Sequence, residues 1–404
     1  MVLLVMVQIG ISRANRGLAA AALLLLAGCT SVHRNPVPLA ATDRAQIPSM
    51  PGVRDWGDEP SPLFQADLVQ SVRDERAANP DGAPPRAVLV LSGGGSNGAF
   101  GAGFLSGWTQ RGTRPTFKLV TGISTGALLA PFAFLGSDYD AEIERLFTTT
   151  TSSEIYRIRN PLTLTVKDSL VRTDPLASTL AEIIDAPLLE EIAAEHRRGR
   201  RLYVGTTNLD AQRLVVWNMG AIAASDAPGA LELFRDVLLA SASIPVAFPP
   251  VYIRVEADGR YYDEMHVDGG VAAMFFLWGA MVDIDDAIEE LGIDPRGNGT
   301  ASIYIIRNGQ IDPAPEQVRP RLAAIAERSM LSVFKTVAMG DLVRIWALAE
   351  RDGVEFHYVG IPSEEAEADT SGFDPEDMRR LFNLGMSMAL EPEPWQREPP
   401  SFFR

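Results

Sequence analysis

Cysteine and positive charge are both scarce in this chain of 404 residues. The single cysteine, Cys29, excludes an intramolecular disulfide and argues against a Cys-based metal site, and we expect neither a metal nor another cofactor. The 36 Lys and Arg residues are outnumbered by 52 Asp and Glu, which leaves a net charge of -16. Proteins recognise nucleic acid by neutralising its phosphates with Lys and Arg, so this charge argues against a nucleic-acid partner.

The rest of the composition is typical of a globular protein. Apolar residues make up 46% of the chain and charged residues 22%, which suffices for a sizeable core. The length fits one large α/β domain or two smaller ones, and we find no internal repeat. Residues 29–85 are rich in Pro, Ala and Asp without sustained periodicity. We interpret them as a tether and a loosely packed lead-in segment, with a short helix over residues 67–77.

Long apolar runs are also missing, and the one near the amino end is short. Arg13 and Arg16 precede an apolar run over residues 17–28, which ends in Leu-Ala-Gly before Cys29. The 12 residues of this run span about 18 Å as a helix, less than the roughly 30 Å of a bilayer core, so residues 17–28 are typical of a signal peptide. The ending resembles the lipobox of bacterial lipoproteins. That resemblance implies cleavage before Cys29 and a lipid anchor there, and Thr30 after it favours the outer membrane of the cell envelope.

Strand–helix alternation begins at Arg86. Apolar runs at residues 87–91 and 117–121 predict buried strands, and each is followed by a helical segment, at residues 97–110 and 127–135. Two such units in succession favour a parallel sheet that helices cover on both faces, a three-layer α/β/α fold. Further strands are predicted at residues 202–207, 261–267 and 302–307.

The carboxyl-terminal part is predicted to be mostly helical. Apolar residues recur at helical spacing between Leu331 and Ile345, and Asp374 with Pro375 is typical of a helix start. We therefore divide the chain into a signal peptide (1–28), the tether and lead-in segment (29–85), a main α/β domain (86–310) and a helical carboxyl-terminal region packed on it (311–404).

Three consecutive glycines, Gly93, Gly94 and Gly95, follow the first strand directly. Such a turn before a helix aims backbone N–H groups at a negative guest. The match to G-x-G-x-x-G raises a dinucleotide site, but the second strand ends without the carboxylate that holds the ribose. A phosphate-binding P-loop fails as well, since no Gly-Lys-Ser/Thr follows. The remaining interpretation is an oxyanion hole, which binds a charge that develops only during a reaction.

The second strand ends in a G-x-S-x-G pattern centred on Ser124. Its two glycines permit the sharp strand-to-helix turn, the nucleophile elbow, that exposes a serine hydroxyl. The hydroxyl needs a base, and the histidines available are His33, His196, His266 and His357. Only His357 lies late enough for an ordinary α/β-hydrolase. Asp268, which ends a strand before two glycines, is the better candidate, because only one βαβ unit separates Gly95 from Ser124.

Four ordered motifs together resemble the patatin-like phospholipases. They are the glycine turn, the elbow, the loop Ser-Ile-Pro-Val-Ala-Phe-Pro-Pro at residues 243–250, and Asp-Gly-Gly at residues 268–270. The resemblance implies a lipid acyl hydrolase of phospholipase A or esterase type, with Ser124 as nucleophile and Asp268 as its base, and with Gly93–Gly95 as oxyanion donors. The chain departs from the family at Ser92 and Asn97, where the family carries Asp and Arg.

Two residue groups near Asp268 are open to more than one interpretation. In an extended strand His266 shares a face with Asp268, where it either tunes that carboxylate or is buried structure. The apolar run at residues 271–281 either lines an acyl-chain pocket or forms core, and we favour core.

Two alternative functions stay open. One is a His-dependent α/β serine esterase, and the other is a non-catalytic lipid-binding lipoprotein. The sequence does not predict an oligomeric state.

Overall fold

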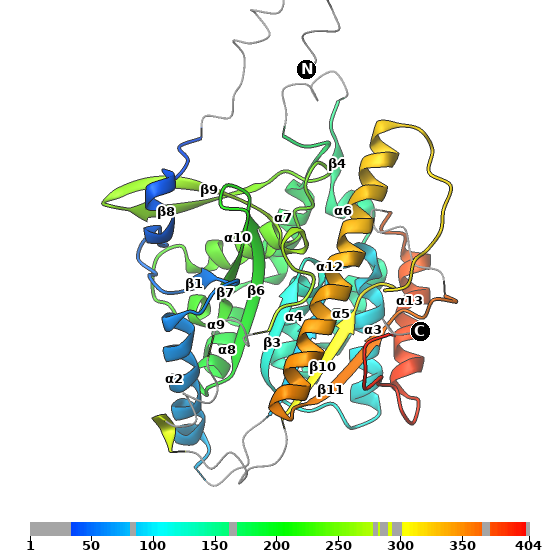
Figure 1. The fold of residues 1–404 in the computed structure, drawn as a ribbon, viewed down its shortest axis with the longest axis horizontal. Helices are drawn as coiled ribbons and strands as arrows, with labels where there is room; N and C mark the ends of the chain where they lie inside the picture. Colours follow the sequence, from blue (N-terminus) through cyan, green and yellow to red (C-terminus); the bar gives the residue numbers. More distant parts are fainter. Residues whose placement is uncertain are drawn as a thin grey trace, which may run out of the picture.

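The computed structural model describes most of the chain: residues 34–80, 86–160, 168–277, 282, 290–292, 301–365 and 372–400. Within them, a nine-stranded sheet forms the middle of three layers (Figure 1). The predicted signal peptide and Cys29 lie outside the described residues. In the described part of the chain, no helix combines the length and apolar character that crossing a membrane requires.

Five parallel strands form the centre of the sheet. In spatial order they are β6 (Arg201–Asn208), β3 (Phe117–Ile123), β2 (Ala87–Leu91), β10 (Ser302–Arg307) and β11 (Glu355–Gly360). Antiparallel strands extend the sheet beyond β6, namely β7 (Arg213–Asn218), β1 (Arg54–Trp56), β9 (Arg260–Asp268) and β8 (Val251–Ala257). The carboxyl ends of β2, β3 and β10 therefore meet at one edge, where a ligand site is expected in such sheets.

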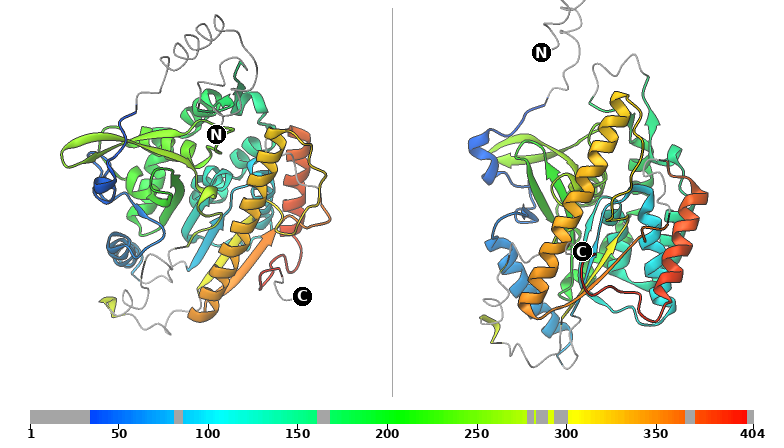
Figure 2. Two further views of the ribbon diagram at one scale, coloured as in Figure 1. Left: turned by 45° about the horizontal axis from the view of Figure 1, so that its top comes forward. Right: turned by 45° about the vertical axis from the view of Figure 1, so that its right-hand side comes forward.

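Helices cover both faces of the sheet, as expected of a parallel core. Alternate residues of β2 separate the two sides: Leu89 and Leu91 belong to the larger core cluster, and Val90 to the cluster beneath α12. One face is covered by α2 (Pro62–Ala78) and α12 (Leu322–Asp352). The other is covered by α3 (Gly98–Gln110), α4 (Thr125–Leu135), α5 (Asp140–Thr149), α7 (Asp174–Ile183), α10 (Ala230–Ser241) and α13 (Pro375–Ala389), and Figure 2 shows α12 and α13 on opposite sides. The predicted three-layer fold is confirmed.

Smaller elements complete the described fold. The helices are η3 (Leu39–Arg44), η4 (Gly95–Asn97), η5 (Ser137–Tyr139), α6 (Ser152–Ile155), α8 (Ala186–Arg197), α9 (Met219–Ala223) and η7 (Gly269–Val271). Strands β4 (Arg157–Ile158) and β5 (Val171–Arg172) form a separate antiparallel pair.

The glycine-rich helix α3 packs closely against the carboxyl-terminal helix α13. A Cβ on Gly103 would lie 1.9 Å from the carbonyl oxygen of Phe382, and one on Gly385 would lie 2.1 Å from that of Phe100. Only glycine allows two helix backbones to approach so closely. Residues from the two ends of the chain therefore form one packed unit directly behind the glycine turn.

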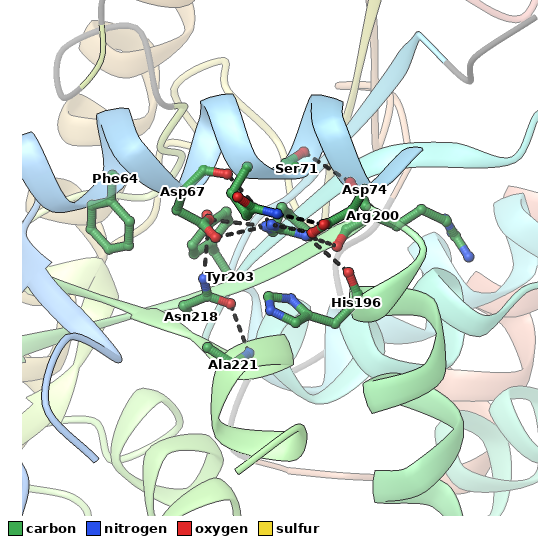
Figure 3. A network of polar contacts seen from close by, with 12 residues as sticks. Phe64, Asp67, Ser71, Asp74, His196, Arg200, Tyr203, Asn218 and Ala221 are labelled. Carbon is green, nitrogen blue, oxygen red and sulfur yellow. Dashed lines mark hydrogen bonds and ion pairs between the residues drawn. The ribbon is translucent and has the colours of Figure 1, made fainter. Parts of the chain in front are cut away.

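The segment before β2 is part of the fold, so the expectation of loose packing is wrong. Strand β1 pairs with β7 in the central sheet, and the side chain of Phe64 is fully buried. Helix α2 is longer than predicted, because the Ser61 hydroxyl caps it by accepting from the Phe64 N–H, and Pro62 stands at its first position. Figure 3 shows how Asp67 of α2 binds β6 and β7: it pairs with Arg201 at 3.0 Å and accepts from Asn218 at 3.1 Å.

Candidate active site

Ser124 stands at the junction of β3 and α4 in a strained backbone conformation. Its φ of 54° and ψ of -125° lie where side chains are rarely found, at a cost of about 1–3 kcal/mol. Both glycines of the motif are needed for the turn. A Cβ on Gly122 would lie 2.5 Å from the Gly126 carbonyl oxygen, and one on Gly126 would lie 2.5 Å from that of Leu91. The local geometry is that of a nucleophile elbow.

A buried serine of α10 holds the elbow in place. The Ser124 N–H donates to the hydroxyl of Ser241 at 2.9 Å, and that hydroxyl donates to the Gly205 carbonyl oxygen of β6 at 2.8 Å. The strained residue is thereby fixed by groups from two other elements, which is the usual way that such a conformation persists.

Asp268 ends strand β9 beside the elbow. Its backbone N–H donates to the Ser243 carbonyl oxygen at 2.9 Å, so the proline-rich loop of the sequence analysis positions this residue. Its carboxylate accepts the Gly270 N–H at 2.7 Å, and the Ser124 side chain is close enough to lower the pKa of that carboxylate. The structure thus brings together two side chains that are 144 positions apart in the sequence.

The carboxylate of Asp268 is buried without a cationic partner among the residues that influence its charge. Burial raises its pKa to about 7, although the Ser124 side chain and the hydrogen bond from the Gly270 N–H favour the charged form. A carboxylate with a pKa near neutrality is a far better proton acceptor than an ordinary one with a pKa of about 4. The surroundings of Asp268 therefore make it a stronger base than an exposed aspartate.

The glycine turn lies directly against the nucleophile. A Cβ on Gly93 would lie 2.9 Å from the Cβ and 3.5 Å from the Oγ of Ser124, and a Cβ on Gly94 would lie 1.9 Å from the Asn308 carbonyl oxygen. Within the described residues, no acceptor is assigned to the N–H groups of Gly93, Gly94 and Gly95. Free backbone donors next to a serine hydroxyl form an arrangement that can bind an oxyanion.

Two residues that the sequence analysis missed hold this turn from β10. Arg307 is buried, and its Nη1 donates to the Gly93 carbonyl oxygen at 3.1 Å. Asn308 donates from Nδ2 to the Ser92 carbonyl oxygen at 2.7 Å, and its Oδ1 accepts the Gly101 N–H at 3.1 Å. An arginine therefore does contact the glycine turn, from a different strand than the family pattern led us to expect. Arg307 ends a predicted strand and Asn308 follows it, at the same sheet edge as the glycine turn. This position is the signal in the sequence that could have identified them.

His266 and His357 have partners other than Ser124 and Asp268. His266 is fully buried between Glu264, at 3.1 Å, and the Thr206 hydroxyl, at 2.9 Å, and burial lowers its pKa. Of the two interpretations offered for His266, buried structure fits these contacts. His357 stacks on Tyr304 at the edge of the sheet, and burial lowers its pKa to about 4.

His196 lies in the last turn of α8. Burial, together with the charge of Arg201, lowers the pKa of His196 to about 4 in the network of Figure 3. His33 lies outside the described residues. Among the side chains described, no group of His, Cys, Asp and Glu is arranged to hold a metal ion.

The apolar run after Asp268 forms core where it is described. Met274 and Phe275 are buried beneath α12, and Phe276 is buried in the cluster that contains Phe64 of α2. The Asp341 carboxylate accepts the Met274 and Phe275 N–H groups at 2.8 and 3.2 Å. The Met274 methyl would lie 3.3 Å from a Cβ on Gly93, so this segment supports the glycine turn. Residues 278–281 of the run lie outside the described part.

Comparison with known proteins agrees with this geometry. Residues 89–281 match the family model described as patatin-like phospholipase. Two solved structures are similar: VipD from Legionella pneumophila (14% identity, TM-score 0.38, 77% of this chain and 68% of that one) and the type III effector protein ExoU (14%, 0.24, 78% and 54%). No curated protein sequence matches the chain significantly.

The matched region contains the glycine turn, the elbow and the Asp-Gly-Gly motif that the structure brings together. The chain therefore contains a patatin-like phospholipase domain and is a hydrolase of the ester bonds of lipids.

Proposed function

We propose that this hydrolase cleaves acyl esters of lipids, in the manner of a phospholipase A or esterase, through a Ser124–Asp268 dyad. The observation that carries the proposal is the position of Ser124, in its strained elbow, next to a buried carboxylate whose pKa burial raises to about 7 and the Ser124 side chain lowers. The glycine turn at Gly93–Gly95 supplies the oxyanion donors.

The reaction then has two steps that share one base. Asp268 takes the proton of the Ser124 hydroxyl as the oxygen attacks the acyl carbonyl, and it returns that proton to the departing alcohol. The N–H groups of the glycine turn bind the oxyanion of the tetrahedral intermediate. In the second step water attacks the acyl carbonyl while Asp268 takes its proton, and Asp268 passes that proton to the departing Ser124 oxygen, which releases the fatty acid and restores the free serine.

Variants of the serine, the aspartate and two histidines, together with one labelling experiment, test this proposal. Ser124→Ala should abolish turnover of a chromogenic acyl ester, and a fluorophosphonate probe should label the parent at Ser124 but not this variant. The folded protein of His266→Ala and of His357→Ala should still turn over the chromogenic ester. Loss of activity in a histidine variant with retention in an Asp268 variant would instead favour a His-dependent esterase. A folded parent that the probe does not label would favour a non-catalytic lipid-binding protein.

We also propose that the mature protein is anchored in the bacterial cell envelope, at the outer membrane, through lipid on Cys29. The support is the sequence pattern that ends at this only cysteine. Metabolic labelling with a palmitate analogue tests the anchor, because Cys29→Ser should remove the label and release the protein from the membrane fraction.

A further inference from the structure

An apolar cavity begins beside the glycine turn and the nucleophile elbow. Gly95 and Thr125, the residue after Ser124, form part of its wall. Its volume is about 70 Å³, and apart from threonine hydroxyls its walls are hydrocarbon and aromatic side chains. A narrow apolar space that starts at the reacting groups suits an unbranched hydrocarbon chain better than a polar head group.

Helical spacing gives the cavity a direction. Thr125, Leu128 and Phe132 are three and four positions apart, so they line one face of α4 from the nucleophile onward. Leu180 and Ile183 present the matching face of α7. The cavity is therefore a trough between two helices, and one end lies at Thr125, the residue after the nucleophile.

The far end of the trough is chemically different. Phe132 and Ile183 also line a second cavity, of about 570 Å³, and half of its other lining residues are acidic. Its carboxylates belong to Asp138, Glu142, Glu182, Asp185 and Glu191. A hydrocarbon chain that extended past Phe132 and Ile183 would enter this acidic, polar space and gain nothing from further burial.

The carboxyl-terminal region closes another side of the trough. Phe373 and Met378 line it, although both lie outside the matched family region at residues 89–281. Phe373 has a φ of 40°, a conformation that a bulky residue rarely adopts and that is retained only when the surroundings impose it. The Ser152 hydroxyl donates to the Gly372 carbonyl oxygen next to it, which fixes this turn against α6.

We propose that this trough binds the acyl chain of the substrate and limits it to medium length, with Phe373 as a specificity-determining residue. The inference rests on the proposed function, since it takes Ser124 as the nucleophile. From Thr125 to Phe132 the α4 axis rises by about 10 Å, the length of roughly eight carbons of an extended chain. The sn-position and the head group are left to the open side of the site.

Chromogenic esters with acyl chains from two to sixteen carbons, assayed on the full chain, test the proposal. Each methylene up to about eight carbons should raise kcat/KM by roughly threefold to fourfold, and longer chains should gain no more. A profile that is flat, or that rises steadily to sixteen carbons, would overturn the proposal. An inactive parent on the two-carbon ester would instead be a failure of the proposed function.

Two variants locate the effect in the trough. Leu128→Trp should lower kcat/KM for the eight-carbon ester at least tenfold and leave the two-carbon ester within about twofold. Leu135→Trp, on the same helix but outside the cavity wall, is the matched control and should not change the profile. Equal losses on both esters, or no change in Leu128→Trp, would contradict the assignment.

The third variant does not depend on fitting a larger side chain. Phe373→Ala widens the trough, so the optimum should move to longer chains by two carbons or more. An unchanged optimum in this folded variant would contradict the role given to Phe373, even if Leu128→Trp failed to fold.

Discussion

Strand β9 carries two buried carboxylates four residues apart whose surroundings differ in charge. Burial alone would raise the pKa of Glu264, but the charge of Arg54 and the hydrogen bond from His266 lower it to about 2. Asp268 has a hydroxyl and a backbone N–H as partners, and burial raises its pKa to about 7. The same burial therefore makes one carboxylate a permanent anion and the other a base, depending on whether a cation is present.

The two carboxylates also differ in what they stabilise. Glu264 binds Arg54 at 3.0 Å, and Arg54 in turn donates to the Ala45 carbonyl oxygen at 3.0 Å, so this pair ties the amino-terminal segment to β9. Asp268 contacts the elbow, where a neutralising cation would remove its basicity. Because the Asp268 carboxylate is buried without a cation, its charged form lowers stability locally, and this loss accompanies its chemical role.

The largest effect is expected from Asp268→Asn. The amide keeps the shape and accepts the Gly270 N–H, but it cannot take a proton, so kcat/KM for a chromogenic ester should fall by about 10³-fold or more. Steady-state kinetics on the purified variant measure this. Turnover within tenfold of the parent would remove Asp268 from the role of base.

Glu264→Gln should lower stability and leave activity largely unchanged, the opposite of Asp268→Asn. It leaves Arg54 charged and buried without its anion, so the free energy of unfolding should fall by about 3–5 kcal/mol. Denaturant unfolding measures the loss, and kcat of the remaining folded protein should stay within about twofold of the parent. A variant that is stable but inactive would show that the two carboxylates do not divide the work in this way.

The pH dependence of stability should separate the two residues further. Because the pKa of Asp268 is higher in the folded state, its contribution is fully present below about pH 4 and is lost as the pH rises through about 7. Glu264, with a lowered pKa, contributes above about pH 4.5 and loses that contribution as the pH falls toward 2.

Thermal unfolding of the parent and of Asp268→Asn at several pH values measures this contrast. The Asn variant should gain stability relative to the parent between pH 4 and 8, by a few kcal/mol at most. A difference that does not change with pH would contradict a raised pKa at Asp268.

A smaller effect is expected where the glycine turn is held. Asn308→Ala removes the hydrogen bonds to the Ser92 carbonyl oxygen and the Gly101 N–H, so the oxyanion donors should lose their alignment. We expect kcat to fall by about tenfold with KM little changed, since the turn acts mainly in the transition state. Asn308→Asp keeps only the acceptor, so its kcat should lie between those of the parent and of Asn308→Ala. A change confined to KM would contradict this role.

The sequence predicted those parts of the fold and site that local patterns encode. The strands at residues 87–91 and 302–307 are confirmed to the residue, and the elbow and the glycine turn could be read from short motifs. Strand β8 was missed because it follows the proline-rich loop directly, and its alternation becomes meaningful only when it pairs with β9.

Contacts across long stretches of chain could not be predicted in the same way. Arg307 meets Gly93 across 214 positions, and Phe373 reaches the trough from beyond the matched region. The raised pKa of Asp268 is equally hidden, because it depends on which charges are absent around the folded carboxylate. A single sequence therefore reveals the residue that reacts. The groups that set the chemistry of that residue become visible only in the fold.

The rate at which a fluorophosphonate labels Ser124, followed across pH with the adduct located by mass spectrometry, tests the central claim most directly. If Asp268 is the base, the rate in the parent should rise with pH through a single ionisation near 7, and Asp268→Asn should label at least a hundredfold more slowly above that ionisation. Labelling of Asp268→Asn at the parental rate, with the same dependence on pH, would contradict the account.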